Sequence, residues 1–431
     1  MTPRTVILAE LSATAIEEFF PFSSLHCLWE LRWGPFRLYE WWQRLFPMAR
    51  VTVAVPPERE LWRRSFLART PAVSEGGVVG PILVVNTQLL PLRRTFHTLA
   101  GIWRDMTAEH KVWAVLTKGV IAALWIDSPT LPDEVVGLGK GRWLPEAAEW
   151  CQRIPHVEQS LPLLHSLWGL IATLPEAFAE AESMLPLGVD LEPWQRRGVW
   201  ILAPERVAIA PTAELAPGVV IDARGGAVII EDRVVCQPHA VLLGPCSIGQ
   251  HSLLRAHVTI GAYTAVGEHC RLGGEVAHSV FHGYANKQHE GFVGHSYLGE
   301  WVNLGAGTTT SNLKNTYGTV RVRLPVGERD TGMQFLGTLC GDHTKTAIGT
   351  CLRTGAVVGV CTNVLSGGMG ARLVPSFSWG DACQPQPYAI EKALEVARRA
   401  MTRRHKELLP EEAELLHREY ERWWSRTAKG M

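Results

Sequence analysis

The chain has 431 residues, which exceeds the usual size of a single hydrophobic core and predicts two or more domains. Its 42 basic residues balance 42 acidic ones, so it lacks the excess positive charge typical of nucleic-acid binding or of attachment to an anionic membrane surface. The nine cysteines include no C-x-x-C pair or other zinc-like spacing, which indicates buried thiols rather than disulfides or a metal cage.

The beginning of the chain does not resemble a signal peptide. The first twenty residues contain Glu10, Glu17 and Glu18 and lack a basic region followed by an apolar stretch. No apolar run in the sequence reaches membrane-spanning length. We therefore expect a soluble cytoplasmic protein whose partners are small molecules, with neither a nucleic-acid nor a membrane partner.

Residues 1–195 alternate between two kinds of apolar pattern. Amphipathic, helix-like stretches such as 35–46 are interspersed with short apolar runs that resemble strands. These strand-like runs are 51–55, 81–85, 112–115 and 120–126. The alternation predicts an α/β domain over 1–195.

Residues 200–380 are rich in Gly, Val, Ile and Thr, and their apolar residues recur with a period of six. The repeating positions are Ile248, Leu254, Ile260, Val266 and Leu272, and small or β-branched residues stand four places later, at Ser252, Val258, Thr264, Cys270 and Val276. Each six-residue unit is expected to form one short strand and one turn, so that inward side chains stack from coil to coil. A parallel β-helix of hexapeptide repeats is therefore predicted.

The period of six recurs farther along the chain before helical patterns return. A second series places Ile348, Thr354 and Val360 at the repeating position, with Leu352, Val358 and Val364 at the same offset of four. Residues 385–431 are predicted to form a helical segment, with Pro410 in a first turn. Its apolar face consists of Ile390, Leu394, Ala397 and Met401.

One segment of the repeat region carries a recognisable motif. From Arg271 it reads RLGGEVAHSVFHGYANKQHEGFVGHSYLGEWVNLGAGTTTSNLKNTYGTVRV, and DTGMQFLGTLCGDHTKTAIGT and PSFSWG follow. Together these motifs resemble the bacterial GlmU-like family of sugar nucleotidyltransferases, which is similar to the bifunctional enzyme that acetylates glucosamine-1-phosphate and couples it to UTP. The match covers about 219–380 closely and the segments ELRWG (30–34) and VVNTQLLP (84–91) less closely.

The resemblance implies a left-handed β-helix that assembles as a homotrimer and binds acyl-CoA in a cleft between neighbouring copies. It also implies an insertion in the six-residue pattern, over about 274–292, that carries the catalytic histidine. Acylating an amino sugar requires a base, and histidine suits this role because its unperturbed pKa lies near the working pH. The alignment assigns the base to His289, and His282 is a rival by proximity in sequence.

The resemblance also implies the substrate-binding residues of the β-helix. They are Arg255, Asn286, Lys287, Asn303, Asn312 and Lys345. For the asparagines, a turn-forming role in a corner of the coil is an equal alternative. Phe292 stands where the bifunctional enzyme has a sugar-binding tyrosine, so the identity of the acceptor sugar stays open.

The N-terminal domain departs from what nucleotidyl transfer requires, which is a Gly-rich loop, a basic residue and acidic ligands for Mg²⁺. The Gly-rich signature is absent, and residues 1–100 contain neither Lys nor Asp. By resemblance, Arg32 and Arg37 are expected to bind the nucleotide, together with Asn86, which occupies the position of a metal-binding aspartate. We expect this domain to keep the fold with weak or altered transferase chemistry.

Three hypotheses follow. The first is a transferase of nucleotide-sugar biosynthesis that acts on a sugar-1-phosphate, with acyl transfer from acetyl-CoA or another acyl-CoA at His289 and Mg²⁺-dependent nucleotidyl transfer in the N-terminal domain. The second is a nucleotidyltransferase whose β-helix only forms the trimer. The third is a non-catalytic protein that binds a sugar nucleotide.

Overall fold

The computed structural model describes residues 2–12, 15–71, 73, 78–127, 137–138, 140–143, 145–365 and 370–425, so the end of the predicted C-terminal segment, 426–431, lies outside the described residues. The chain divides into two compact units. The first comprises 1–17, 26–31 and 36–165, and the second comprises 18–25, 32–35 and 166–431. Two short N-terminal segments thus belong to the second unit, whereas the sequence predicts one domain over 1–195.

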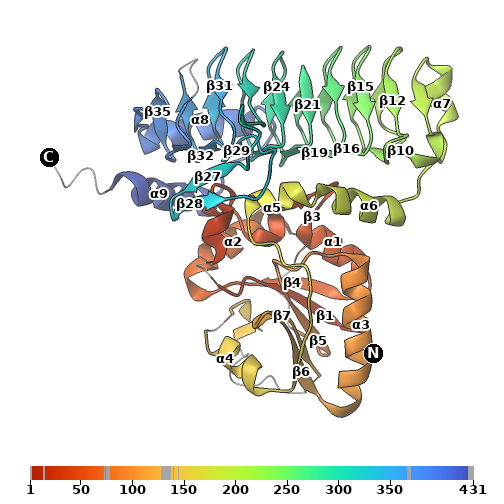
Figure 1. Cartoon of the computed structure of the whole chain (residues 1–431), viewed down its shortest axis with the longest axis vertical. Helices are drawn as coiled ribbons and strands as arrows, with labels where there is room; N and C mark the ends of the chain where they lie inside the picture. Colours follow the sequence, from red (N-terminus) through yellow and green to blue (C-terminus); the bar gives the residue numbers. More distant parts are fainter. Residues whose placement is uncertain are drawn as a thin grey trace. The chain divides into compact units, whose positions relative to one another are not determined.

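The first unit is built on one mixed sheet (Figure 1). Its strands are β1 (Thr5–Ala9), β4 (Arg50–Ala54), β5 (Ile82–Asn86), β6 (Val112–Thr117), β7 (Val120–Ile126) and β8 (His156–Glu158), in the order β4-β1-β5-β7-β6-β8. Strand β1 pairs in parallel with β4 and β5, while β7 runs antiparallel to β5 and β6. All four strand-like runs identified in the sequence form strands, which confirms the α/β prediction.

The helices of the first unit pack aromatic side chains against this sheet. They are α1 (Leu38–Leu45), α2 (Glu60–Arg69), α3 (Arg93–Glu109) and α4 (Pro145–Arg153). In α1, Leu38, Trp41 and Trp42 are buried at the i, i+3 and i+4 spacing of one helix face. Trp103 of α3 contacts Trp125 of β7 edge to face, with ring centroids 4.4 Å apart.

The second unit contains a parallel β-helix, whose coils form a row from β10 to β35 in Figure 1. Its first face consists of β10 (Val207–Ile209), β13 (Val228–Ile230), β16 (Cys246–Ile248), β19 (Thr264–Val266), β22 (Val280–Phe281), β25 (Tyr297–Leu298), β29 (Leu339–Cys340), β32 (Val357–Val358) and β34 (Leu373–Val374).

The second face has β11 (Glu214–Leu215), β14 (Val235–Cys236), β17 (Leu253–Leu254), β20 (Arg271–Leu272) and β23 (Asn286–Lys287), then β30 (Lys345–Thr346), β33 (Asn363–Val364), β35 (Ser378–Gly380) and the antiparallel β36 (Gln386–Pro387). The third face has β9 (Trp200–Leu202), β12 (Val220–Asp222), β15 (Val241–Leu243), β18 (Thr259–Ile260), β21 (Glu275–Ala277) and β24 (Phe292–Gly294), then β26 (Thr309–Thr310) and β31 (Cys351–Leu352).

The first six-residue series points inward, as predicted. Its repeating residues are all buried, and so are the small or β-branched residues four places later. The second series has a different register from the predicted one. Leu352, Val358 and Val364 belong to the core, whereas Ile348 is 80% exposed. The prediction for Ile348 is wrong because the residue stands in a turn between β30 and β31.

The corners of the β-helix hold stacked rings in a left-handed backbone conformation. One column, which we call the corner ladder, consists of His251, His269, Tyr284, Trp301 and His343. Each of these residues has a φ between 55° and 61°. This conformation costs a non-glycine residue roughly 1–2 kcal/mol, which the ring stacking offsets. The three histidines of this column therefore have a structural role, since their rings stack at the corners of the β-helix.

The predicted insertion over 274–292 is absent, and this prediction is wrong. The segment forms an ordinary part of the β-helix through β21 to β24, because backbone pairing continues even where the inward apolar pattern lapses at Lys287. An excursion instead separates β26 from β29, and it contains a hairpin of β27 (Arg321–Leu324) and β28 (Gly327–Asp330).

Helices flank the β-helix in the second unit. They are α5 (Leu167–Ala172), α6 (Leu174–Met184), α7 (Glu192–Arg196), α8 (Ile390–Thr402) and α9 (Pro410–Trp424). The predicted apolar face of α8 is buried, and Pro410 stands in the first turn of α9, as expected. Among the described residues, no helix combines the length and apolar composition that crossing a bilayer requires.

Candidate functional site

A basic pocket of about 240 Å³ opens on the second face of the β-helix, beside the end of α8. The residues that line it are Arg271, Tyr284, Asn286, Gln288, Trp301, Val302, Asn303, Lys345, Ala400, Arg403 and Arg404. We call it the basic pocket. All of its lining residues belong to the second unit. Three of the predicted substrate-binding residues, Asn286, Asn303 and Lys345, are therefore brought together.

Those three residues form a column because their backbones pair from coil to coil. Asn286 bridges to Asn303, and Asn303 bridges to Lys345. Asn286 donates a side-chain hydrogen bond to Asn303, and its own oxygen accepts from Gln288 at 2.6 Å. The amides therefore orient one another at the pocket wall.

The pocket gathers positive charge without an acidic side chain among its described lining residues. Burial lowers the pKa of Lys345, whose Nζ donates to the His343 carbonyl at 2.8 Å. Burial also lowers the pKa of Arg404, and repulsion from Arg271 and Arg403 lowers it further. An anion in the pocket would relieve this repulsion.

His289, the predicted base, stands outside the basic pocket at the turn that follows β23. Its side chain is exposed and has no hydrogen-bond partner among the described residues. Its carbonyl accepts from Lys287 Nζ at 2.9 Å. His289 follows Gln288, which lines the pocket, and its predicted role as the base stays a prediction.

Lys287 does not lie where a substrate-binding residue would. It pairs with Leu272 at an inward position of the β-helix, and only 2% of its surface is exposed. Its Nζ donates to the carbonyls of Gly273 and His289 at 2.7 and 2.9 Å. Burial lowers the pKa of Lys287 to about 8, although the nearby carboxylates of Glu290 and Glu275 act to raise it. In this structure Lys287 holds the turn that carries His289, and its predicted contact with a substrate stays a prediction.

Arg255 and Asn312 lie apart from the basic pocket. Arg255 is exposed after β17 and does not line the pocket. Asn312 Nδ2 donates to His295 Nδ1 at 2.9 Å, and the His295 ring stacks between His278 and Phe335. The turn with His289 connects the strand that holds Asn286 to β24, which begins with Phe292 and ends beside Asn312.

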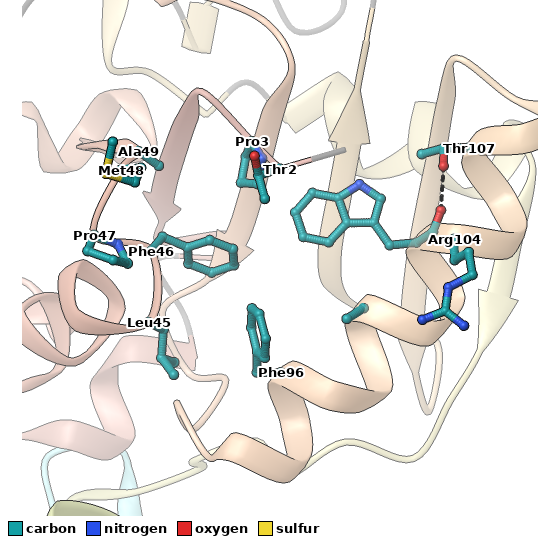
Figure 2. Close-up of a pocket in the computed structure, with 12 residues that line it drawn as sticks. Thr2, Pro3, Leu45, Phe46, Pro47, Met48, Ala49, Phe96, Arg104 and Thr107 are labelled. Atoms are coloured by element: carbon teal, nitrogen blue, oxygen red, sulfur yellow. Dashed lines mark hydrogen bonds between the residues drawn. The ribbon is translucent and has the colours of Figure 1, made fainter. Parts of the chain in front are cut away.

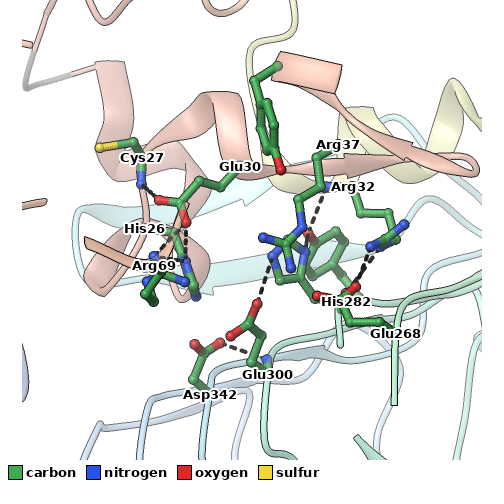
Figure 3. A network of polar contacts seen from close by, with 12 residues as sticks. His26, Cys27, Glu30, Arg32, Arg37, Arg69, Glu268, His282, Glu300 and Asp342 are labelled. Carbon is green, nitrogen blue, oxygen red and sulfur yellow. Dashed lines mark hydrogen bonds and ion pairs between the residues drawn. The ribbon is translucent and has the colours of Figure 1, made fainter. Parts of the chain in front are cut away.

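His282, the rival base, is buried inside a polar network of the second unit (Figure 3). Its Nδ1 and Tyr297 Oη are 3.0 Å apart, and its Nε2 lies 3.5 Å from a Glu300 oxygen. Arg32 donates to the His282 carbonyl at 3.1 Å and pairs with Glu268 at 2.8 Å. With no exposed surface, His282 cannot reach a substrate in this conformation.

The predicted nucleotide-binding residues are divided between the two units. Arg32 belongs to the second unit and Arg37 to the first, where Arg37 precedes α1 and its backbone N–H donates to Glu40. Asn86 is buried in the sheet of the first unit, where its Nδ2 donates to Ile121 and its oxygen accepts from Gln88. Their predicted grouping around a nucleotide stays a prediction.

These residues also do not fit Mg²⁺. Ligands of α/β sheets bind at the carboxyl ends of the strands. At the end of β1, the buried Glu10 carboxylate accepts from Leu28 at 2.7 Å and pairs with Arg59 at 2.8 Å. Neither Asn86 nor Glu10 therefore offers the uncommitted oxygens that Mg²⁺ prefers.

A second buried cluster of the first unit involves Glu30 (Figure 3). Its carboxylate pairs with Arg69, accepts from the Cys27 backbone at 2.8 Å and lies 3.1 Å from His26 Nδ1. Burial alone would raise the pKa of Glu30, but Arg69 and His26 outweigh it and lower the pKa to about 2. This cluster is internal to the fold.

A larger pocket of about 450 Å³ lies in the first unit between the end of α1 and α3 (Figure 2). Phe46, Phe96 and Trp103 form its apolar wall, and Met48 and Arg104 also line it. It contains none of the predicted nucleotide-binding residues. The basic pocket, although smaller, is lined by three of the predicted substrate-binding residues.

Sequence reasoning missed Arg271, Arg403 and Arg404 as candidate site residues. Arg271 could have been found, since it pairs with Asn286 on the preceding coil and so shares its outward direction. Arg403 and Arg404 follow the end of α8, and the repeat pattern gives no information about where that helix packs.

Comparison with known proteins gives several relatives of one kind. The curated protein "Bifunctional protein GlmU" of Rippkaea orientalis is 30% identical over 145 residues, covering 28% of this chain and 31% of that protein. The protein of the same name from Nostoc sp. is 27% identical over 215 residues, which cover 43% of this chain and 42% of that protein. The one from Methylococcus capsulatus is 26% identical over 238 residues, covering 53% and 48%.

The chain is related to GlmU. The relationship that the motifs predicted is thus confirmed, and the chain spans less than half the length of these relatives. No protein-family model matches the chain.

Comparison with solved structures gives two partial matches. A hexapeptide transferase family protein from Anaplasma phagocytophilum is 12% identical and covers 55% of this chain and 99% of its own, with a TM-score of 0.22. A mutant perosamine N-acetyltransferase from Caulobacter crescentus, in complex with CoA and GDP-perosamine, is 13% identical. Its match covers 54% of this chain and 83% of that protein, with a TM-score of 0.12. TM-scores this low support no inference about site or activity.

Proposed function

We propose that the chain is a cytoplasmic transferase that moves an acyl group from acyl-CoA to the amino group of a sugar phosphate at the β-helix. The observation that carries this proposal is the basic pocket, which gathers Asn286, Asn303 and Lys345 beside the turn of His289. The GlmU relationship supports the same assignment. The predicted homotrimer would place acyl-CoA between neighbouring copies.

In the proposed reaction, His289 acts as the general base. The imidazole removes a proton from the acceptor amine, whose nitrogen forms a bond to the thioester carbonyl carbon. The C–S bond then breaks, and the CoA sulfur takes up a proton and leaves as the thiol. The amide side chains of the pocket wall supply hydrogen-bond donors for the acceptor sugar.

Nucleotidyl transfer is not part of this proposal. The nucleotide-binding prediction requires Arg32, Arg37 and Asn86 to act together with Mg²⁺, and the side chains of Arg32 and Asn86 have structural partners instead. The first unit has a mixed sheet, and the oxygens of Asn86 and Glu10 in it already have partners.

His289→Ala tests the proposal. Loss of a general base is expected to reduce CoA release from acetyl-CoA by roughly 10²–10⁴-fold in the presence of the correct amino-sugar phosphate. The measurement is thiol release with a panel of sugar phosphates, including glucosamine-1-phosphate, together with the product mass. The matched control is His417→Ala, which removes an exposed histidine of α9 and should leave the rate unchanged.

The same assay separates the alternatives. Unchanged CoA release in His289→Ala would contradict the assigned base and favour a β-helix that only joins copies of the chain. Tight ligand binding without any product, across all tested acyl-CoAs and sugar phosphates, would favour the non-catalytic binding protein.

A further inference from the structure

Four cationic side chains converge on the basic pocket from two distant parts of the chain. Arg271 and Lys345 come from the second face of the β-helix, and Arg403 and Arg404 come from the residues just after α8. Within the described residues, none of the four forms an ion pair with a carboxylate. Arg271 and Arg403 repel Arg404, and Lys345 lines the same pocket, so the pocket has an excess of positive charge.

The end of a helix explains only part of this arrangement. Cations are favourable near a helix C-terminus, because the backbone dipole there is negative, which accounts for Arg403 and Arg404 individually. It does not account for Arg271 and Lys345, which the β-helix orients toward the same pocket. Bringing like charges together while removing water from them is unfavourable unless an anion is bound.

The rest of the lining specifies what kind of anion fits. Asn286, Asn303 and Gln288 supply amide groups, and the pocket of about 240 Å³ is smaller than the roughly 300–1,000 Å³ of sites that enclose a whole ligand. The guanidinium group of arginine can donate two parallel hydrogen bonds to phosphate oxygens, and the ammonium group of lysine adds a positive charge. The dimensions suit a phosphorylated head group whose remainder projects out of the pocket.

We propose that the basic pocket binds the phosphate or diphosphate group of a phosphorylated ligand, with Arg404 and Arg403 of the α8 end closing it over Arg271 and Lys345. This inference deepens the proposed function, since a sugar-1-phosphate and acyl-CoA both carry such a group. It concerns binding alone, so it stands or falls independently of catalysis by His289.

The test is calorimetric titration of the full chain with three probes: inorganic pyrophosphate, CoA and glucosamine-1-phosphate. At least one probe is expected to bind, and Arg404→Gln and Arg271→Gln should each weaken that binding by about 10–100-fold. The affinity should also fall as salt is raised. Arg398→Gln, on the exposed side of α8, is the matched control and should bind as the unmodified chain does.

The pattern among the probes identifies the source of the phosphate. Arginine-dependent binding of glucosamine-1-phosphate assigns the pocket to the acceptor, whereas arginine-dependent binding of CoA and pyrophosphate assigns it to the acyl donor. Binding that is unchanged in both variants, or no binding of any probe to the folded chain, would overturn the inference. Arginine-dependent binding without turnover would retain the inference while contradicting the proposed function.

Discussion

Lys287 and His289 are two residues apart in sequence but differ completely in environment. Lys287 is at an inward position and uses its ammonium group to hold the following turn, while His289 is exposed on that turn. In a continuing strand, residues two apart would face the same way. The turn after β23 reverses this expectation, so a motif that reads as one cluster in the sequence separates into a structural residue and a candidate base.

His295 makes the stability of the β-helix dependent on pH. Burial lowers its pKa to about 4, and His278 beside it adds to the shift. Its Nδ1 accepts from Asn312, which requires that nitrogen to be unprotonated. The unfolded histidine, with an ordinary pKa near 6.5, binds a proton at higher pH than the folded one.

The neutral ring therefore stabilises the fold fully above about pH 6.5, and this contribution is lost progressively as the pH falls toward about 4. We expect the thermal unfolding midpoint to drop over this range. His295→Phe keeps a stacking ring without a titrating group, so its midpoint should drop less between pH 7 and 4.5. An equal drop in both proteins would show that His295 does not contribute.

At the scale of elements, the β-helix shows which positions of a six-residue repeat face inward. Backbone pairing from coil to coil sets this register, and an apolar residue followed by Gly does not by itself identify an inward position. Ile260 and Ile348 are each followed by a glycine, Gly261 and Gly349, yet Ile260 is in a strand and fully buried, whereas Ile348 is in a turn and 80% exposed.

This difference predicts unequal effects of the same substitution. Ile260→Ala removes a buried side chain from the stack and should destabilise the second unit by about 2–5 kcal/mol. Ile348→Ala removes an exposed side chain and should change the stability by no more than about 0.5 kcal/mol. Denaturant unfolding followed by circular dichroism measures both, and similar losses in the two variants would contradict the register.

At the scale of the whole molecule, the second unit is not a continuous stretch of chain. It includes 18–25 and 32–35, in addition to everything after residue 166. Phe22 packs edge to face on His282 with ring centroids 5.2 Å apart, and Arg32 pairs with Glu268. A boundary drawn near residue 195 therefore leaves part of the second unit behind.

The fragment 166–431 should consequently be less stable than the same residues in the full chain. Without Arg32 and Phe22, the polar network around His282 loses partners that stabilise it. We expect a lower unfolding midpoint and faster proteolysis than in the full chain. Arg32→Ala in the full chain should show part of the loss, about 1–3 kcal/mol. If the fragment were as stable as the full chain, the N-terminal segments would not contribute to the stability of the second unit.

The fold class and the general region of the site follow from the sequence because they depend on local periodicity. A spacing of six with inward aliphatic residues specifies short strands and turns wherever it occurs, and the motif from Arg271 to Val322 indicated which coils matter. Asn286, Asn303 and Lys345 meet because equivalent positions of successive coils align. The failures occur where this regularity stops, at the turn after Lys287 and at Ile348.

Contacts between segments far apart in the chain were decided only by the tertiary structure. The packing of α8 brings Arg403 and Arg404 to Arg271, and the N-terminal Arg32 pairs with Glu268. Periodicity describes which way a side chain points along its own element but carries no information about the distance to another element. The composition of the basic pocket and the division of the chain into units depend on such distances, so they emerge only when the chain is folded.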